Sequence, residues 1–191
     1  MTTARDSDSP ATAIVLMAEG SEEIETYAPA DVLVRAGIEV TVAGVNGLTP
    51  TGSRGLAMRA ERLMGAIRGQ LFDAVVVPGG NGGADAIAKS DEAMLCIRNH
   101  AEAGRLIAAI CAAPAVVLGP AGLLAGKRAT GYPSTREMFP ADATYVDEAV
   151  VEDGNLITSK GPATAIAFGL AIAARLTDEA TAREVAEGML V

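Results

Sequence analysis

The chain has 191 residues, a length typical of one domain with a substantial buried core. Its formal net charge is −9 and it has no run of Lys and Arg, so it would repel a phosphate backbone, and we expect no specific nucleic-acid binding. Half of the residues are hydrophobic but only 3% are aromatic, so Ala, Val, Leu and Ile must build the core.

Cysteine content and hydropathy bear on the protein's surroundings. The two cysteines, Cys96 and Cys111, are too few for a disulfide framework, which favours a reducing, cytoplasmic setting. The uncharged stretch 106–126 is rich in Ala and interrupted by Pro and Gly, so we interpret it as a buried strand and helix rather than a membrane span. Residues 1–12 are predicted to be a flexible polar tail, and residues 13–191 a single domain.

Apolar runs of strand length alternate with segments of helical periodicity. Strands are predicted at 13–18, 38–45, 73–80 and 106–110, with a hairpin of 147–152 and 155–159; helices are predicted at 22–37, 91–104, after Cys111, at 161–176 and after Thr177. The strands are apolar on both faces. This pattern predicts an α/β fold with a mainly parallel sheet covered by helices on both sides.

Several residues are suited to mark the helix ends. Gly37 and Gly104 can end helices, Ser90 and Thr177 can cap them, and Pro162 can occupy a first helical position. The segment predicted as the first helix has residues spaced roughly one helical turn apart: Ile24, Tyr27, Ala28, Asp31 and Val32.

Cys111 lies where a predicted strand meets a helical segment. Ligands bind at the carboxyl ends of strands in open α/β sheets, and Ala112 and Ala113 are small enough for a tight turn there. Free N–H groups of the following helix would favour the thiolate and lower the pKa of the thiol from about 8.5. A lone cysteine in an apolar run is also typical of inert core packing, and the local sequence leaves both interpretations open.

The glycine-rich segment "PGGNGGAD" at 78–85 lacks the spacing of a dinucleotide-binding loop and the Lys of a P-loop. Its N–H groups could form an oxyanion hole beside a nucleophile, or the segment could simply be a turn. The acidic cluster of Glu22, Glu23 and Glu25 is expected at a helix start, where carboxylates are favourable. One of them turned inward could exchange protons with a thiol, but spacing does not say which.

His100, the chain's one histidine, is predicted on a solvated face of the helix at 91–104, and Cys96 is predicted to pack structurally on the same helix. One histidine and two cysteines spread in this way do not make a zinc site.

Five ordered motifs together resemble the ThiJ/PfpI superfamily: "AEGSEEIET", "DAVVVPGGNGGA", "LIAAICAAPAV", "TGYPS" and "LITSKGPATAIAFGLAI". Within it they are most similar to the branch of the parkinsonism-associated protein deglycase and its bacterial relatives. The match runs from about Ala13 to the final helix. It implies a flavodoxin-like three-layer sandwich with a reactive cysteine at a nucleophile elbow.

The resemblance also implies roles for individual residues. Cys111 matches the nucleophile, and Glu25 matches the protonated glutamate that hydrogen-bonds its thiolate. The backbone N–H groups of Gly80 and Ala112 match the oxyanion donors. Residues expected to line the pocket are Gly79, Asn81, Tyr132, Pro133, Ser159, Gly161 and Pro162.

By the same resemblance, the protein would act without metal or organic cofactor on small reactive aldehydes, converting methylglyoxal or glyoxal to the hydroxy acid without glutathione, or on glycated protein side chains. It would form a homodimer. The alternative is a non-enzymatic redox sensor or holdase chaperone that acts through oxidation of Cys111. A third possibility is an unreactive Cys111 in a domain that only binds partners.

The chain departs from the family pattern at two positions. Tyr132-Pro133 stands where many relatives have a histidine before the proline, and a phenol of pKa about 10 cannot replace an imidazole base near neutral pH. Ala112 stands where the peptidase branch has a histidine directly after the cysteine, so proteolysis is not expected.

Overall fold

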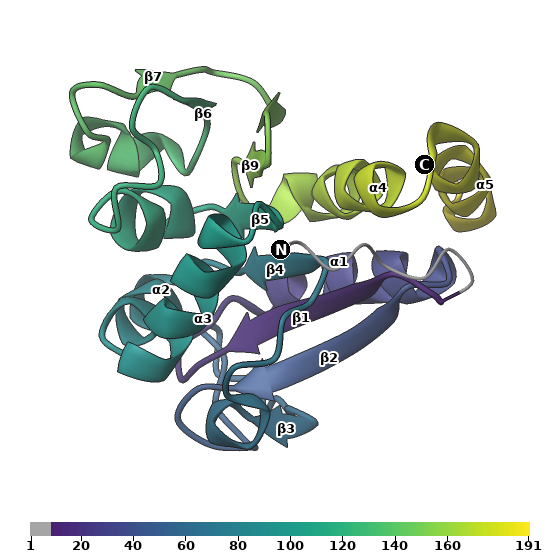
Figure 1. Ribbon diagram of the computed structural model, residues 1–191, viewed down its shortest axis with the longest axis horizontal. Helices are drawn as coiled ribbons and strands as arrows, with labels where there is room; N and C mark the ends of the chain where they lie inside the picture. Colours follow the sequence, from purple (N-terminus) through teal and green to yellow (C-terminus); the bar gives the residue numbers. More distant parts are fainter. Residues whose placement is uncertain (1–8) are drawn as a thin grey trace.

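The computed structural model describes residues 9–191, which are built around a seven-stranded sheet of order β3-β2-β1-β4-β5-β9-β8 (Figure 1). All neighbouring strands in it are parallel except β8, which forms the expected antiparallel hairpin with β9. The strands of this sheet are β1 Thr12–Met17, β2 Glu39–Gly44, β3 Arg62–Leu63, β4 Ala74–Val77, β5 Leu106–Ile110, β8 Val150–Asp153 and β9 Leu156–Ser159. Two short strands, β6 Arg128–Ala129 and β7 Thr144–Tyr145, pair with each other in a separate sheet. Most of the predicted tail, residues 1–8, lies outside the described residues, and Thr12 already belongs to β1.

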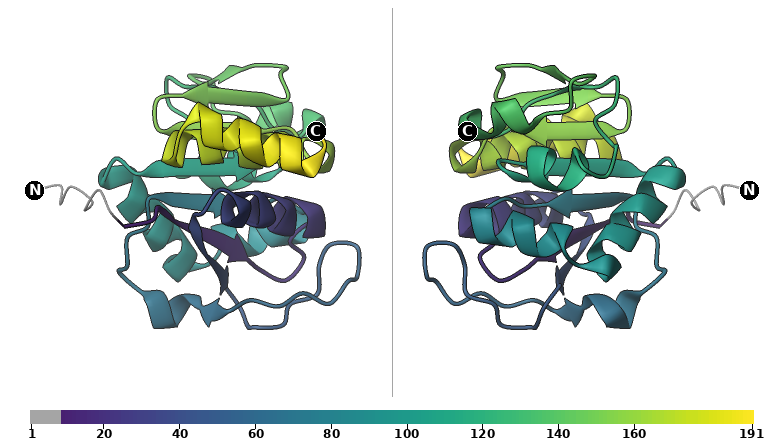
Figure 2. Two further views of the ribbon diagram at one scale, coloured as in Figure 1. Left: turned by 90° about the vertical axis from the view of Figure 1, so that its right-hand side faces the viewer. Right: turned by 90° about the vertical axis from the view of Figure 1, so that its left-hand side faces the viewer.

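Helices cover both faces of this sheet, as predicted. They are α1 Glu23–Arg35, α2 Asn81–Ala88, α3 Asp91–Glu102, α4 Ala165–Leu176 and α5 Glu179–Met189, with short helical turns η1 Met64–Ile67, η2 Pro114–Leu118, η3 Pro133–Met138 and η4 Pro162–Thr164. In Figure 2, α1, α4 and α5 lie on the side that faces the viewer on the left, with α5 in front of α4, and α2 and α3 lie on the side that faces the viewer on the right. The three-layer, flavodoxin-like sandwich is therefore confirmed. None of the helices in residues 9–191 is long and apolar enough to cross a membrane.

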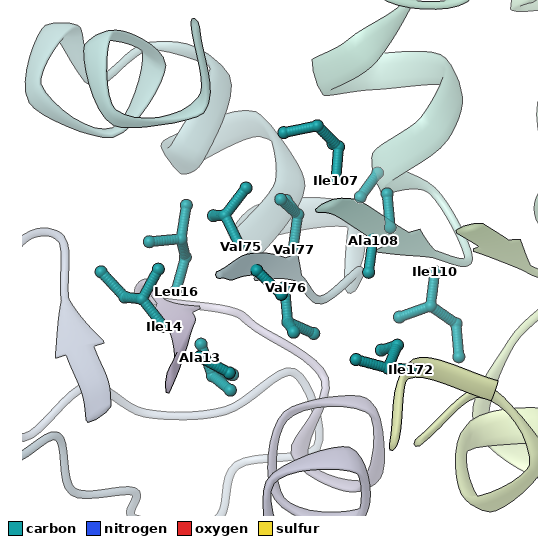
Figure 3. Close-up of a cluster of buried hydrophobic side chains, with 14 of the residues drawn as sticks. Ala13, Ile14, Leu16, Val75, Val76, Val77, Ile107, Ala108, Ile110 and Ile172 are labelled. Atoms are coloured by element: carbon teal, nitrogen blue, oxygen red, sulfur yellow. The ribbon is translucent and has the colours of Figure 1, made fainter. Parts of the chain in front are cut away.

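The core lies between the central strands and the helices. Figure 3 shows labelled side chains of β1, β4 and β5 with Ile172 of α4, and residues such as Ile14, Val76 and Ile110 are at most 1% exposed. Burial of each such side chain contributes about 1.5–3 kcal/mol. Because the central strands are buried on both faces, their apolar runs are continuous rather than alternating.

The capping predictions were partly right. The hydroxyl of Ser90 accepts a hydrogen bond from the N–H of Ala93 at 3.2 Å and caps α3, as predicted. Thr177 does not cap α5, because Asp178 does so by accepting from the N–H of Thr181 at 2.8 Å. The Thr177 hydroxyl instead donates to a carbonyl in the last turn of α4.

The spacing of apolar residues predicted the helix α1 but not which of its faces is buried. Ile24 is 53% exposed and Tyr27 38% exposed, whereas Pro29, Val32 and Leu33 are buried. The reason is close packing against α4, where the absence of a side chain at Gly169 leaves room for Pro29 and Val32. The buried face of α1 is therefore the one that fits closely against Gly169 of α4, and the larger side chains of Ile24 and Tyr27 lie on the exposed side.

The strand order indicates where on the sheet a ligand would bind. From β1 the chain crosses to β2 on one side, while β4 pairs with β1 on the other, so the topology reverses between β1 and β4. Ligands bind at the carboxyl ends of strands at such a reversal. The segments that follow β1, β2, β4 and β5 all reach this point.

Candidate active site

Cys111 follows β5 directly and has a φ of +64°, a left-handed conformation that is unfavourable for a side chain by about 1–2 kcal/mol. Its neighbours hold it there: its N–H donates to the carbonyl of Ser159 at 2.9 Å, and its carbonyl accepts from the N–H of Tyr132 at 2.7 Å. This is the geometry of a nucleophile elbow, in which the strand turns sharply and presents one side chain. Backbone strain that the surroundings maintain is typical of a functional position rather than of inert packing.

Glu25, in the first turn of α1, is completely buried beside this cysteine. Its Oε2 accepts a hydrogen bond from the N–H of Gly79 at 2.9 Å, while its Oε1 is buried with no hydrogen-bond partner in residues 9–191. A Cβ atom at position 79 would lie 2.6 Å from both the Cys111 Cβ and the Glu25 Oε2. Glycine at this position therefore lets the carboxyl and the thiol come together.

The two side chains perturb each other's protonation. Burial raises the pKa of the Glu25 carboxyl to about 7, against the lowering effect of the Cys111 thiol, and the charge of Glu22 raises it further. Burial also raises the pKa of the Cys111 thiol to about 12, and the charge of Glu25 adds to this. Groups this strongly coupled titrate as a pair, so once the pH exceeds about 7 the two groups hold one proton between them.

The predicted lowering of the thiol pKa is wrong. The backbone N–H groups of Gly80 and Ala112 do lower the pKa of Cys111, but burial and the neighbouring carboxylate outweigh them. The same two N–H groups are those expected to act as oxyanion donors. Gly80 reaches this position with a φ of +81°, which glycine adopts at little cost.

The structure separates the acidic residues that the sequence left equivalent. The Glu22 side chain caps α1 by accepting from the N–H of Glu25 at 2.8 Å. The Glu23 carboxylate is also buried and binds the loop that follows β2, accepting from the N–H of Arg54 at 2.8 Å. Of the three, only Glu25 faces the cysteine.

A cavity of about 530 Å³ opens above the pair. Its lining residues are Glu19, Gly20, Glu22, Glu25, Thr51, Gly52, Ser53, Arg54, Gly80, Gly82, Cys111, Tyr132 and Pro162. Among them Arg54 carries the one positive charge. The cavity is therefore a mixed pocket, polar and acidic, with a single cation on the wall formed by the loop after β2.

The residues expected to line the pocket fall into two groups. Tyr132 and Pro162 do line it, whereas Gly79 and Gly161 lie behind it and leave room for Glu25 and for the Tyr132 ring. Pro133 and Ser159 are not among the described residues that line it. Pro133 begins η3 at the exposed surface, the buried Ser159 hydroxyl donates to the carbonyl of Ala149 behind the pocket, and Asn81 begins α2.

Sequence reasoning missed one wall of the pocket, the loop Thr51–Arg54, together with Glu19 and Gly20 after β1. The loop has no periodicity and no chemical motif. One available signal was its place after a predicted parallel strand, at the same sheet edge as Cys111.

The prediction for His100 is wrong. Its side chain is 0% exposed, it accepts a hydrogen bond at Nε2 from the N–H of Phe72 at 3.0 Å, and Nδ1 lies 2.7 Å from the carbonyl of Cys96. These partners assign the neutral tautomer protonated at Nδ1, and burial lowers the pKa of the imidazole. Burial likewise raises the pKa of Cys96 to about 11, in keeping with a packing role. The described residues contain no group of three or more His, Cys, Asp or Glu that could hold a metal ion.

Comparison with known proteins agrees with this geometry. The chain belongs to the DJ-1/PfpI family, whose profile matches residues 11–175. It is 45% identical to protein dj-1beta of Drosophila melanogaster over 181 residues, which cover 94% of this chain and 96% of the relative. It is 33% identical to the glutathione-independent glyoxalase DJR-1.2 of Caenorhabditis elegans over 159 residues, with 83% and 84% covered.

A solved structure confirms the fold at the level of the whole chain. The structure of oxidised Toxoplasma gondii DJ-1 superposes with a TM-score of 0.91 at 38% sequence identity, covering 94% of this chain and 98% of the other. This similarity extends over nearly the whole chain and shows that the two proteins share one fold.

Proposed function

We propose that the protein converts α-oxoaldehydes such as methylglyoxal to hydroxy acids, with Cys111 as the nucleophile and Glu25 as the proton carrier. The observation that carries the proposal is the buried carboxyl of Glu25, with one oxygen unpartnered, beside a cysteine held at a strained elbow. A relative named as a glutathione-independent glyoxalase supports the same reaction class. Cys111 would supply the thiol that glutathione supplies in glutathione-dependent enzymes.

The first step uses the shared proton. Above the pKa of about 7, Glu25 is ionised and takes the thiol proton as the sulfur attacks the aldehyde carbon. The developing oxyanion is stabilised by the N–H groups of Gly80 and Ala112. Glu25 then returns the proton to that oxygen, which gives a neutral hemithioacetal.

The second step is an isomerisation. Glu25 removes the proton bound to the former aldehyde carbon and delivers it to the adjacent carbon, while the hydroxyl proton moves from the first oxygen to the second. The product is a thioester of the hydroxy acid. Water then adds to the thioester, the carbon–sulfur bond breaks, and the thiol is regenerated with one proton from water.

The same addition chemistry would apply to early glycation adducts on protein side chains, because two residues of the cavity lining, Arg54 and Tyr132, are exposed at the surface. Tyr132 is 46% exposed, so its ring can contact a substrate without closing the entrance. We extend the proposal to glycated side chains as a second substrate class at the same site.

The test is lactate formation from methylglyoxal in the absence of glutathione. Cys111→Ser should lower kcat/KM by at least about a thousandfold, because a serine hydroxyl is far harder to ionise than a thiol. Cys96→Ser, which removes the other cysteine, should leave the rate within about twofold. Turnover that survives Cys111→Ser would refute the proposed mechanism.

A redox-sensing role is the second candidate. A sulfinate on Cys111 would accept hydrogen bonds from protonated Glu25 and from the N–H groups of Gly80 and Ala112, and the solved structure of a related protein, Toxoplasma gondii DJ-1, is of an oxidised form. Mild peroxide should then add two oxygens selectively to Cys111, measured by intact-mass and peptide mass spectrometry. Equal oxidation of Cys96 would count against this role.

We also propose a homodimer through the exposed side of α1. Ile24, Tyr27 and Val34 are between 38% and 59% exposed on this helix, an unusual concentration of large apolar side chains for a solvated face. Sedimentation of the purified chain at micromolar concentration distinguishes a dimer from a monomer.

A further inference from the structure

The loop after β2 forms one wall of the pocket, yet no strand pairing of the central sheet holds it. It contributes Thr51, Gly52, Ser53 and Arg54 to the lining. An isolated bridge between Thr51 and Ala57 closes the loop on itself. Its position over Cys111 must therefore come from contacts with the neighbouring segments.

The densest of these contacts is a single carboxylate. Oε1 of Glu23 accepts hydrogen bonds from the N–H groups of Arg54 at 2.8 Å and Leu56 at 3.3 Å, and Oε2 accepts from the Ser53 hydroxyl at 3.3 Å. A Cβ at Gly52 would lie 2.3 Å from Glu23 Oε1, so the loop wraps closely around the carboxylate. Burial alone would raise the pKa of Glu23, but these hydrogen bonds hold it below its ordinary value, so the group stays ionised.

The loop and the catalytic pair interact electrostatically. Burial is the main cause of the raised pKa of Glu25; the neighbouring charge of Glu22 raises this pKa further, and the guanidinium of Arg54 lowers it. Glu23 and Glu25 both lie in the first turn of α1, so one helix end fixes the loop that carries the cation and also carries the proton acceptor.

We infer that Glu23 is a positioning residue, whose buried carboxylate holds the loop 51–56 as a wall of the Cys111 pocket and keeps Arg54 in the lining that Glu25 shares. The inference about catalysis rests on the proposed function, but the fixing of the loop does not. Carboxylates that accept several backbone N–H groups form strong, directional anchors. Without the anchor, the contacts left to the loop in the described residues would be its backbone bonds to Gly20 and Ser21, the bond from Thr51 N–H to Glu19, and bonds within the loop such as that from the N–H of Gly52 to the carbonyl of Leu56.

The first measurement is limited trypsin cleavage of the Arg54–Gly55 bond, which needs no enzymatic activity. Glu23→Ala should be cut at least about tenfold faster than the wild type, because a protease acts on the opened loop. Glu23→Gln keeps an oxygen that can accept both N–H groups and should be intermediate. Glu187→Ala, which changes an exposed glutamate on α5, is the matched control and should match the wild type.

The second measurement is the pH profile of kcat/KM for methylglyoxal. Release of the loop removes the Arg54 charge from Glu25, so the profile of Glu23→Ala should move to higher pH. Arg54→Gln should move it in the same direction while the loop stays anchored. A purely structural Glu23 would lower the rate equally at every pH.

The two measurements keep the possible failures apart. If the wild type does not turn over methylglyoxal, the proposed function fails, and cleavage still decides whether Glu23 holds the loop. If Glu23→Ala does not fold, Gly52→Ala tests the same contact with Glu23 intact. Its added methyl group would clash with the Glu23 carboxylate, displace the loop and so speed cleavage. Wild-type cleavage rates in both Glu23→Gln and Gly52→Ala, or an unmoved pH profile in Glu23→Ala, would overturn the inference.

Discussion

At the scale of single residues, Glu25 is a position where the proposed function lowers the stability of the folded protein. A buried carboxyl with an unpartnered oxygen and a pKa of about 7 destabilises the folded state once it ionises. Such a group persists where it has a task, and a pKa near neutral pH suits a group that accepts and returns a proton.

This perturbation predicts a stabilising substitution. Between about pH 4.5 and about pH 7 the unfolded chain releases the Glu25 proton while the folded chain retains it, so stability falls as the pH rises through this window. Glu25→Gln removes the dependence. It should raise the free energy of unfolding by about 3 kcal/mol at pH 8, with little change near pH 4.5, and abolish turnover.

Urea unfolding at the two pH values measures this difference directly. Glu187→Gln on the exposed face of α5 controls for the general effect of removing a negative charge. An equal difference between Glu25→Gln and wild type at both pH values would contradict a raised pKa at this site.

The sequence predicted the site residues unevenly. Cys111 was recognisable from its place at a strand end, but the choice of Glu25 over Glu22 and Glu23 needed the family resemblance. The distinguishing contacts are the cap on the Glu25 N–H, the loop around Glu23 and the N–H of Gly79, and all of them join segments distant in sequence or depend on side-chain direction. The prediction that His100 is exposed was wrong for the same reason, because its hydrogen-bond partner Phe72 lies 28 residues away in the sequence.

At the scale of elements, the sheet and the major helices were predictable because buried parallel strands leave continuous apolar runs. The interface between α1 and α4 was not. A Cβ at Gly169 would lie 2.9 Å from the Val32 Cβ and 3.1 Å from the backbone of Pro29, so the two helices meet at a glycine. Hydrophobic periodicity does not reveal an interface that depends on the absence of a side chain.

This close contact makes Gly169→Ala informative. Alanine is favoured over glycine in a helix by about 1 kcal/mol, yet here the added methyl must push backbone apart, so we expect a net loss of about 1–3 kcal/mol in unfolding free energy. Gly188→Ala in α5 is the matched control, because nothing lies within 4 Å of its added Cβ. It should be neutral or stabilising; a stabilising Gly169→Ala would show that the helices do not pack this closely.

At the scale of the whole molecule, the pocket exists only when the fold is complete. Its residues follow β1, β2, β4 and β5, with Tyr132 and Pro162 added from later segments, so no single motif contains the site. The net charge of −9 makes the protein as a whole repel polyanions. Among the residues that line the pocket, Arg54 carries the positive charge, and it belongs to the loop after β2. The sequence could predict the sheet edge where these segments meet, but not the loop that closes it.

The central claim is that Cys111 and Glu25 act as one unit that shares a proton. It is tested most directly by the pH dependence of kcat/KM for methylglyoxal between about pH 5 and pH 9. The structure predicts a rise through an apparent pKa of about 7, as Glu25 becomes able to accept the thiol proton, followed by a plateau. A flat profile, or a rise centred near the pKa of about 8.5 of an ordinary thiol, would contradict it.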